Sequence, residues 1–472
     1  MDLSKLTIAE ARRALDAKEY SALELTNAYL SAIDEKDGDI HAYLEVWHVS
    51  ARAEAVAADA MIASGNVQPL TGIPIAIKDN ILIDGRVVSG GSKILEKYVA
   101  SYDSTVAKKL KSQGAVLLGR TNMDEFALGS STENSAYGPT KNPHDMSRVP
   151  GGTSGGSAAA VAAGLALGAL GSDTGGSIRQ PAALCGVVGV KPTYGAVSRF
   201  GLIAAASSLD QIGSIGKTVE DAQIIFDAIK GYDANDSTSL PDAAGNTRNF
   251  KQTVGIPRSF LKGLSEEMKA RFDATVGQLS EKGYTVVDID LPSLEYALAV
   301  YYIINPAEVS TNLSRFDGIR YGHSVQAQSI QEVYTKSRGE GFGPESRRRI
   351  IVGTFVLSAG YSDAYYRKAR ALRDNIRADF KRVFETVDAV VLPTTPSPAF
   401  RLGEKNSDPV SLYLEDIFTV PVNLAGVPAM SVPMGTVERD GVQLPVGFQI
   451  ITAHGNEAAL FKIGTDVENS AV

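Results

Sequence analysis

The chain of 472 residues contains a single cysteine, Cys185, so it can form no disulfide bond within itself. One cysteine in a chain of this length suits a reducing compartment, and we expect a cytoplasmic protein. The opening residues, MDLSKLTIAEARR, include no apolar core of the kind that a secretory signal needs. The run of small residues at 158–170 is too short and too interrupted by glycine to span a bilayer.

The chain also lacks a surplus of positive charge and a cluster of histidines. Its 46 Lys and Arg residues face 54 Asp and Glu residues, which gives a net charge of −8, and no long stripe of Lys and Arg stands out. This composition disfavours a protein that binds nucleic acid by itself, so we expect any nucleic acid to be held by a partner. The five histidines stand in no motif, and no Cys/His metal spacing exists, so no metal site is predicted.

Three familiar catalytic motifs are present only in part. Residues 152–156 match the G-x-S-x-G nucleophile elbow by letter, but that motif needs a histidine base. Residues 214–217 match S-x-x-K, yet the S-D-N and K-T-G elements that accompany it are absent. Residues 216–218, Gly-Lys-Thr, lack the glycine five residues earlier that a P-loop needs, so no ATP site is visible in this chain.

The chain begins with two predicted helices. Thr7 and Glu10 have the spacing of a capping box, and so do Ser21 and Glu24. Four apolar residues after the second cap fall on one helical face. We expect the two helices to form a hairpin against the main body. The residues of that apolar face are Leu25, Tyr29, Ala32 and Ile33.

From residue 73 onward, short apolar runs alternate with helix-length stretches such as 219–230 and 266–282. This alternation predicts an α/β fold in which a central sheet is covered by helices on both faces. Asp440-Gly441 between two late runs predicts a hairpin, so the sheet should be mixed. The runs predicted as buried strands are 73–77, 115–118, 165–170, 254–256, 284–289, 389–392, 429–432 and 448–451.

We predict a single domain over residues 1–472, in which the N-terminal helices occupy 1–60. The polar, turn-rich stretch 233–252 is expected to be a surface excursion rather than a domain boundary. It leads into a βαβ-like insertion that ends near residue 300. The sequence contains no internal repeat and no low-complexity tract.

The strongest chemical signal lies in residues 150–186, PGGTSGGSAAAVAAGLALGALGSDTGGSIRQPAALCG. Two glycine-rich loops, 151–157 and 171–177, flank a segment of small residues, and glycine lets the backbone approach a ligand closely. Consecutive N–H groups at 174–177 can form an anion-binding nest. Aimed at a developing alkoxide, such a nest is an oxyanion hole, in which one donor is worth about 3 kcal/mol. Glycine alone would fit two flexible loops, but the hydroxyl groups beside it favour the catalytic interpretation.

A second segment, GIPIAIKDN at 72–80, carries Lys78 directly after an apolar run. A lysine in that position either extends to solvent or is buried and functional. Taken alone, the segment favours solvent exposure for Lys78.

GGTSGGSAAA is followed by GSDTGGSIRQPA, and GIPIAIKDN stands upstream of both. In this combination the chain resembles the amidase signature family, and within it the amidase subunits, known as A subunits, of the amidotransferases that serve Glu-tRNA(Gln) and Asp-tRNA(Asn). The resemblance extends over nearly the whole chain and is weakest at 233–252 and at the end. Supporting segments are TNMDEFALGSSTENSAYGPTKNP at 121–143, KPTYGAVSRFGLIAAASSLDQIG at 191–213, YYIINPAE at 301–308 and YLEDIFTVPVNLAG at 413–426.

The resemblance implies an amidase-signature fold and a serine nucleophile. The family nucleophile corresponds to Ser177 and the family lysine to Lys78. The bridging hydroxyl, a serine on a cis peptide in the family, corresponds to Thr153, where this sequence departs from the pattern; Ser154 is the neighbouring alternative and a candidate substrate contact. A serine needs a base, and a lysine serves as one only when neutral, which burial favours. The backbone of the implied oxyanion hole belongs to Thr174, Gly175, Gly176 and Ser177.

In this subfamily the amide donor is glutamine. Recognition of its α-groups corresponds to Arg349 and Asp416, whose unlike charges suit a carboxylate and an ammonium. Tyr301 is a further candidate, for which core packing is the competing interpretation, and Arg349 could also lie on a solvated helix face. Asp173 and Arg179 flank the nucleophile and are expected to orient its loop.

The resemblance further implies a heterotrimer. A tRNA-binding B subunit is expected to bind ATP and Mg²⁺, and a small C subunit completes the complex, so this chain would hold no cofactor and meet tRNA only through its partner. One alternative is a stand-alone amidase that acts on a small or aryl amide, against which the segments at 301–308 and 413–426 argue. Another is a non-catalytic structural subunit, which Thr153 alone among the motif residues supports.

Overall fold

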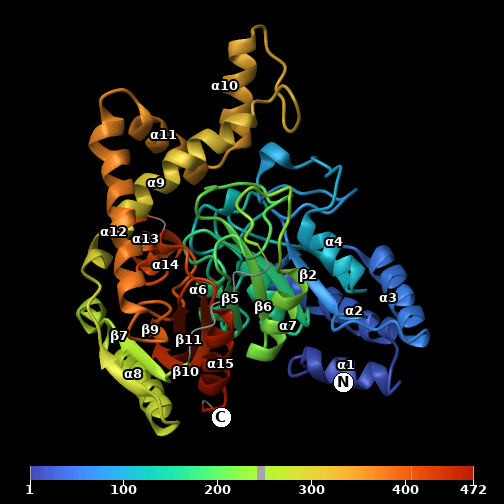
Figure 1. Cartoon of the computed structure of the whole chain (residues 1–472). Coiled ribbons are helices and arrows are strands. Elements are labelled where there is room, and N and C mark those ends of the chain that lie inside the picture. The colour runs from blue at the N-terminus through green and yellow to red at the C-terminus, as the bar shows by residue number, and fades with distance from the viewer. Residues whose placement is uncertain (1, 242–249, 406, 471–472) are drawn as a thin grey trace.

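The computed structural model describes residues 2–241, 250–405 and 407–470, and a single β-sheet runs through its centre (Figure 1). Within the described residues this sheet has eleven strands. Their order across the sheet is β1 (Tyr43–Val46), β3 (Val116–Thr121), β2 (Pro74–Lys78), β4 (Gly168–Asp173), β6 (Gln211–Gly216), β5 (Val188–Lys191), β10 (Ala429–Arg439), β11 (Val442–Thr452), β9 (Ala389–Pro393), β7 (Thr253–Ile256) and β8 (Thr285–Asp288).

The sheet is mixed, as the sequence predicts. β2 lies parallel to both β3 and β4, and β7 lies parallel to β8 and β9. The strands between β4 and β9 pair in antiparallel fashion. The predicted hairpin joins β10 to β11 through Asp440 and Gly441, whose φ angles of 54° and 79° are both positive, as a type I′ turn requires.

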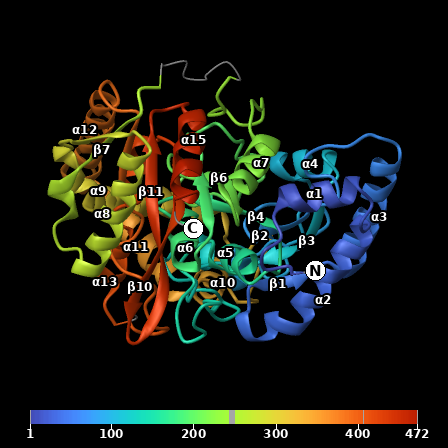
Figure 2. The ribbon, with the colours of Figure 1, turned by 90° about the horizontal axis from the view of Figure 1, so that it is seen from below.

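Helices cover both faces of the sheet (Figures 1 and 2). α7 (Val219–Ile229) packs on one face, where Ile225 approaches Gly168 of β4. α5 (Gly155–Ala162) and α6 (Arg179–Cys185) lie on the opposite face, where Ile178 approaches Gly171 of the same strand. Odd and even positions of a strand point to opposite faces, so β4 is covered on both.

The other helices are α1 (Ile8–Asp16), α2 (Ala22–Ile40), α3 (His48–Ala63), α4 (Thr105–Ser112), α8 (Glu266–Glu281), α9 (Ala297–Asn312), α10 (Ile330–Gly341), α11 (Pro344–Leu357), α12 (Arg367–Val383), α13 (Pro409–Tyr413), α14 (Val420–Ala425) and α15 (Glu457–Glu468). Among the described residues, we find no helix with the length and apolarity needed to cross a membrane.

The central strands are buried on both faces, which explains their continuous runs of apolar and small residues. β2, β4, β6 and β9 carry only buried residues. The prediction of a buried strand at 284–289 is wrong in its burial, because β8 lies at the edge of the sheet with Thr285 and Asp288 exposed. The sequence prediction also missed β1, β5 and β6; β1 and β5 have only four residues each, and β6 contains two glycines, which weaken the strand signal.

The N-terminal helices begin where the sequence predicts but pack differently. Both capping boxes are formed, at Thr7 and Glu10 and at Ser21 and Glu24, and the predicted apolar face of α2 is buried. The expected hairpin of the two helices is wrong. α1 lies mainly against α7, where Asp221 accepts the backbone N–H of Ile8 at 2.7 Å, and α2 packs along α3.

The region after residue 250 forms a parallel β-α-β unit from β7, α8 and β8 at the edge of the sheet. In the predicted polar excursion at 233–252, residues 242–249 lie outside the described part of the chain.

α9, α10 and α11 form the upper part of the molecule, from which α10 projects (Figure 1). The start of α11 is attached to the body through Glu125, whose carboxylate accepts the backbone N–H of Gly343 at 2.8 Å and the hydroxyl of Ser346 at 2.5 Å. Further along, Gly353 of α11 lies so close to α9 that a Cβ atom there would be 1.9 Å from the carbonyl oxygen of Pro306. α11 is therefore held at a fixed distance from α9.

This contact predicts a stability difference between two helical glycines. Gly353→Ala should lower the free energy of unfolding by about 1–3 kcal/mol, because the added methyl group pushes α11 away from α9. Gly339→Ala in α10 is the matched control, since nothing lies within 4 Å of the new methyl group, and it should raise stability by up to about 1 kcal/mol. Urea denaturation of both variants measures the difference; equal stabilities would contradict the close α9–α11 contact.

Candidate active site

The loop that carries Ser177 connects β4 to α6 and is closely surrounded. A Cβ on Gly175 would lie 2.7 Å from the ring of Tyr301, and a Cβ on Gly176 would lie 2.2 Å from the hydroxyl of Thr419. Gly176 also has a φ of 134°, which side chains rarely adopt. The two glycines therefore let the loop pass between α9 and the start of α14.

A buried ion pair holds this loop in place, in the orienting role expected of Asp173 and Arg179. The guanidinium of Arg179 binds both carboxylate oxygens of Asp173, at 3.0 and 2.9 Å. Its remaining N–H groups reach the carbonyl of Thr419, the amide oxygen of Gln449 and that of Asn423. Burial alone would raise the pKa of Asp173, but Arg179 and the other donors hold that pKa well below its usual range. Asp173 is therefore a permanent carboxylate at the base of the loop.

The backbone N–H groups of the loop divide into two sets. The N–H of Gly176 donates to Asp173 Oδ1 at 2.9 Å, so Gly176 is not available as an oxyanion donor, in contrast to the prediction. The N–H groups of Thr174, Gly175 and Ser177 have no acceptor among the described residues. These three can bind an anion beside the hydroxyl of Ser177, which likewise has no partner in the described chain; its side chain is nearly buried, at 7 % exposure.

Lys78 ends β2 and is fully buried, so the expectation of solvent exposure from its segment alone is wrong. The parallel pairing of β2 with β4 brings Lys78 next to the end of β4, where the loop that carries Ser177 begins. Its Nζ atom donates to Thr153 Oγ1 at 2.7 Å, to Ser154 Oγ at 2.8 Å and to the carbonyl oxygen of Ser172 at 3.3 Å. Burial disfavours the ammonium form and lowers the pKa of Lys78 to about 7, although three nearby carboxylates act in the opposite direction. They belong to Asp124, Asp173 and Asp210.

Only one of these three partners has a proton to offer Lys78. The carbonyl of Ser172 can only accept, and the hydroxyl of Ser154 donates to that carbonyl at 3.1 Å while accepting the N–H of Ser172 at 3.3 Å. Among the described residues, Thr153 Oγ1 forms a hydrogen bond with Lys78 alone. A neutral amine has one lone pair, and the geometry favours the Thr153 hydroxyl as the group that faces it. The peptide bond between Gly152 and Thr153 is cis.

Arg349 is buried, at 4 % exposure, so the interpretation as a solvated helix face is wrong. Its Nε donates to Glu345 at 2.6 Å and its Nη1 to the amide oxygen of Asn305 at 3.2 Å. The guanidinium also lies 4.6 and 4.8 Å from the ring centres of Tyr302 and Tyr413. Nη2 has no acceptor among the described residues, so the edge formed by Nη1 and Nη2 can still bind a carboxylate with two hydrogen bonds.

Asp416 and Tyr301 lie in the same region. Asp416 is buried and accepts the hydroxyl of Ser130. Burial raises the pKa of Asp416 to about 8, while Arg349 lowers it, so the two side chains are close enough to interact electrostatically. Tyr301 packs on Gly175, and its hydroxyl accepts from Asn305 at 3.3 Å. Tyr301 therefore links the nucleophile loop to the surroundings of Arg349.

Sequence reasoning did not single out three buried carboxylates of the site. Asp124 accepts backbone N–H groups at 132 and 134 and lies against Gly152; Asp210 accepts the hydroxyl of Thr174 at 2.7 Å. Both stand in segments that carry the family resemblance, but no spacing marks them. Glu345 precedes Arg349 by four residues, and this helical ion-pair spacing could have identified it. In the described part of the chain no group of His, Cys, Asp and Glu side chains is arranged to hold a metal ion.

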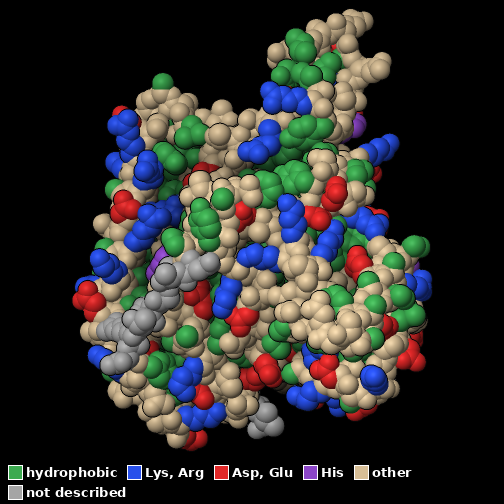
Figure 3. Space-filling view, turned by 45° about the vertical axis from the view of Figure 1, so that its right-hand side comes forward, with side chains coloured by type: hydrophobic (Ala, Val, Ile, Leu, Met, Phe, Trp, Pro, Cys, Tyr) green, Lys and Arg blue, Asp and Glu red, His purple; other side chains and the backbone are tan. Residues whose placement is uncertain are grey.

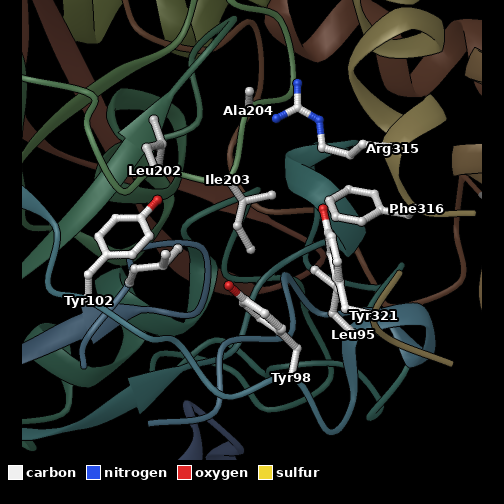
Figure 4. A pocket seen from close by; sticks show the side chains of 10 residues that line it. Leu95, Tyr98, Tyr102, Leu202, Ile203, Ala204, Arg315, Phe316 and Tyr321 are labelled. Atoms are coloured by element: carbon white, nitrogen blue, oxygen red, sulfur yellow. The ribbon is translucent and has the colours of Figure 1, made fainter. Parts of the chain in front are cut away.

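A separate cavity of about 120 Å³ lies between η1 (Lys93–Leu95) and η5 (Leu313–Arg315) (Figure 4). The hydroxyls of Tyr98, Tyr102 and Tyr321 surround Ile203 in this view, and Arg315 also lines the cavity. None of the predicted site residues lines it. The candidate site is therefore the cluster of buried side chains around Ser177 and not this cavity.

Known proteins resemble this chain over nearly its whole length. The sequence model of the family described as Amidase matches residues 24–461. The chain is similar to the A subunit of the glutamyl-tRNA(Gln) amidotransferase of Desulfosudis oleivorans, at 49% identity over 100% of this chain and 98% of that protein, and to its namesake from Koribacter versatilis, at 50% identity over 100% and 99%.

Two solved structures have the same fold over almost their full length. The A subunit of the Thermotoga maritima glutamyl-tRNA(Gln) amidotransferase superposes with a TM-score of 0.80 at 41% identity, covering 99% of this chain and 95% of that one. A protein from a vestigial complex that reveals the origins of an s-triazine catabolic enzyme superposes with a TM-score of 0.85 at 32% identity, covering 99% of each chain.

The contacts of Lys78 generate a test of which hydroxyl serves it. Thr153→Val keeps the shape but removes Oγ1, so we expect the rate of amide hydrolysis to fall by at least about a hundredfold, whereas Thr153→Ser should stay active. Ser154→Ala is the control, because it leaves the Thr153–Lys78 contact intact and should lose much less. Steady-state ammonia release measures all three; an active Thr153→Val beside an inactive Ser154→Ala would assign the bridge to Ser154.

Proposed function

The chain belongs to the amidase signature family, and from this membership we propose that it is the glutaminase subunit of a tRNA-dependent amidotransferase. It hydrolyses the side-chain amide of glutamine and supplies ammonia for the conversion of Glu-tRNA(Gln) to Gln-tRNA(Gln), of Asp-tRNA(Asn) to Asn-tRNA(Asn), or of both. The observation that carries the proposal is the fully buried Lys78 in contact with Thr153 below the loop of Ser177, since this arrangement supplies a base for a serine nucleophile.

In the proposed mechanism Ser177 Oγ attacks the amide carbon of glutamine. Its proton passes to Thr153, whose own proton passes to the neutral Lys78. The N–H groups of Thr174, Gly175 and Ser177 stabilise the oxyanion of the tetrahedral intermediate. Lys78 then returns a proton through Thr153 to the leaving nitrogen, and ammonia departs. Water then attacks the resulting ester and gives a proton through Thr153 to Lys78. Lys78 returns this proton to Ser177 Oγ as the ester bond breaks, and glutamate leaves. The hydrogen bonds that carry these proton transfers commonly tighten only when substrate is bound.

The substrate-binding proposal concerns the α-groups of glutamine. The unoccupied donors of Arg349 suit the α-carboxylate, and Asp416 suits the α-ammonium. With a pKa of about 8, Asp416 is largely protonated at neutral pH, and the arriving ammonium would favour its ionised form. Tyr301 lies between the loop that carries Ser177 and the two charged side chains, Arg349 and Asp416. Amides without these two groups would gain nothing from Arg349, which favours glutamine over the small or aryl amides of a stand-alone amidase.

The partners are proposed from the relatives. Proteins that share half of the residues of this chain are named as the A subunit of glutamyl-tRNA(Gln) amidotransferase, and a further solved relative comes from a protein complex. We therefore assign tRNA, ATP and Mg²⁺ to a tRNA-binding B subunit and expect a small C subunit to complete a heterotrimer. The net charge of −8 agrees with a chain that leaves tRNA to its partner.

The direct test is ammonia release from glutamine by the purified chain, alone and with its partners. Ser177→Ala should reduce the rate by several orders of magnitude. Arg349→Met should raise KM for glutamine by at least about tenfold, because a bidentate charged contact is lost, while hydrolysis of an amide without an α-carboxylate should be unchanged. Wild-type protein that hydrolyses aryl amides efficiently and glutamine poorly would instead support a stand-alone amidase.

The pKa of Lys78 predicts the pH dependence. The base must be neutral, and burial lowers its pKa from 10.5 to about 7, so the active form accumulates as the pH rises through 7. At pH 6 about one molecule in ten carries neutral Lys78, and kcat/KM should fall by about tenfold for each further unit of acidity. A pH profile of kcat/KM between 5.5 and 8.5 measures this; a flat profile would exclude Lys78 as the base. Lys78→Arg should be inactive throughout, because arginine does not release its proton.

A further inference from the structure

A cluster of large apolar side chains is exposed where α11 ends and the chain turns through η6 (Ser362–Tyr366) into α12. Ile351 is 69 % exposed and Phe355 48 %. Exposed apolar patches of this kind on a soluble protein mark interaction sites. We call this surface the α11–η6 face; it consists of Ile351, Val352, Phe355, Leu357, Tyr361 and Tyr365.

The aromatic members of the α11–η6 face support one another. The rings of Phe355 and Tyr361 lie 4.3 Å apart, and Tyr365 lies 6.3 Å from Phe355 and 6.2 Å from Tyr361. Aromatic rings in such contact lose little conformational freedom when a partner covers them. The face is therefore a preorganised surface and not a set of isolated side chains.

The segment that forms this face carries a surplus of positive charge. Between residues 347 and 370 the exposed charged side chains are five cations and one carboxylate, Asp363, in a chain whose net charge is −8. Arg348 is ion-paired with Glu345 and Arg367 with Asp363, while the other three cations have no ion-pair partner among the described residues. Over the lower part of the molecule, by contrast, cationic and acidic side chains are mixed (Figure 3). A surface with an apolar centre and a cationic rim is complementary to one with an apolar centre and an acidic rim. The five cations are Arg347, Arg348, Arg367, Lys368 and Arg370.

We infer that the α11–η6 face is the docking site for an acidic surface of one of the partner proteins in the proposed amidotransferase. The inference rests on the proposed function. A second copy of this chain is a poor occupant, because a symmetric contact would place the cations against themselves. RNA is a weaker match, because only the cations at the rim would contact a phosphate backbone, while the aliphatic side chains of Ile351 and Val352 would stay uncovered.

The location of this face connects it to the substrate site. α11 directs Ile351 and Phe355 outward and Arg349 inward, two residues away from Ile351. Gly353 fixes the helix against α9, which carries Tyr301 and Asn305. A partner that docks on this face is therefore separated only by the thickness of α11 from the arginine proposed to bind glutamine.

The experiment compares a double variant, Ile351→Asp/Phe355→Asp, with the control Val49→Asp. Val49 is 84 % exposed at the start of α3, far from the face (Figure 1). The tRNA-binding and small subunits of the same organism are co-expressed, purified and titrated onto each variant by biolayer interferometry. We expect the double variant to lose at least about tenfold in affinity, as loss of buried aromatic and aliphatic anchors does, and the control to match wild type. Glutamine hydrolysis by the isolated double variant should equal that of wild type, which shows that its fold is intact.

Arg367→Glu/Arg370→Glu should also weaken the complex, and raised salt should reduce the difference between it and wild type. Wild-type affinity in the aspartate double variant would overturn the docking site while leaving the proposed function in place. Failure of the wild-type chain to assemble with the two subunits would overturn both. A wild-type homodimer that the double variant converts to a monomer would assign the face to a second copy, and loss of tRNA binding by the isolated double variant would assign it to RNA.

Discussion

The burial of one amino group, that of Lys78, is the constraint on which the site depends. An isolated ammonium in the protein interior costs several kcal/mol, so its environment must both neutralise it and satisfy its hydrogen bonds. Thr153, Ser154 and the carbonyl of Ser172 satisfy them, and they come from a different loop and a different strand. The parallel pairing of β2 and β4 brings these segments together, so the base exists only when this part of the sheet is formed.

The second constraint is the rigidity of the loop that carries Ser177. Arg179 binds Asp173 on one side. On its other side it donates to Thr419, which directly precedes α14, to Asn423 of α14 and to Gln449 of β11. The nucleophile loop leaves β4, which pairs with the β2 strand of Lys78, and Arg179 also ties the loop to β11 in the other half of the sheet. Among the residues that the structure describes, three backbone N–H groups of this glycine-rich loop have no acceptor and lie beside the serine. These N–H groups can stabilise the negative charge that develops there.

α11 illustrates how one helix serves two purposes. Its inward side presents Arg349 with two ring contacts and a glutamate, and its outward side exposes aliphatic and aromatic residues. Glu125 and Gly353 hold the helix to the body at its start and near its end. The position of Arg349 therefore depends on contacts with η2 (Glu125–Ala127) and α9 that lie far from it in the sequence.

The sequence alone determined the mixed α/β architecture, both N-terminal caps, the hairpin at Asp440-Gly441 and the family, because these follow from local periodicity, turn chemistry and contiguous motifs. It could not determine the burial or the hydrogen-bond partners of the polar side chains in the site. Tertiary structure alone decided that Lys78 and Arg349 are buried, that Gly176 gives its N–H to Asp173, and that α1 packs on α7. The reason is physical: a side chain's exposure, its pKa and its free hydrogen bonds depend on segments brought beside it by the sheet, which no local pattern records.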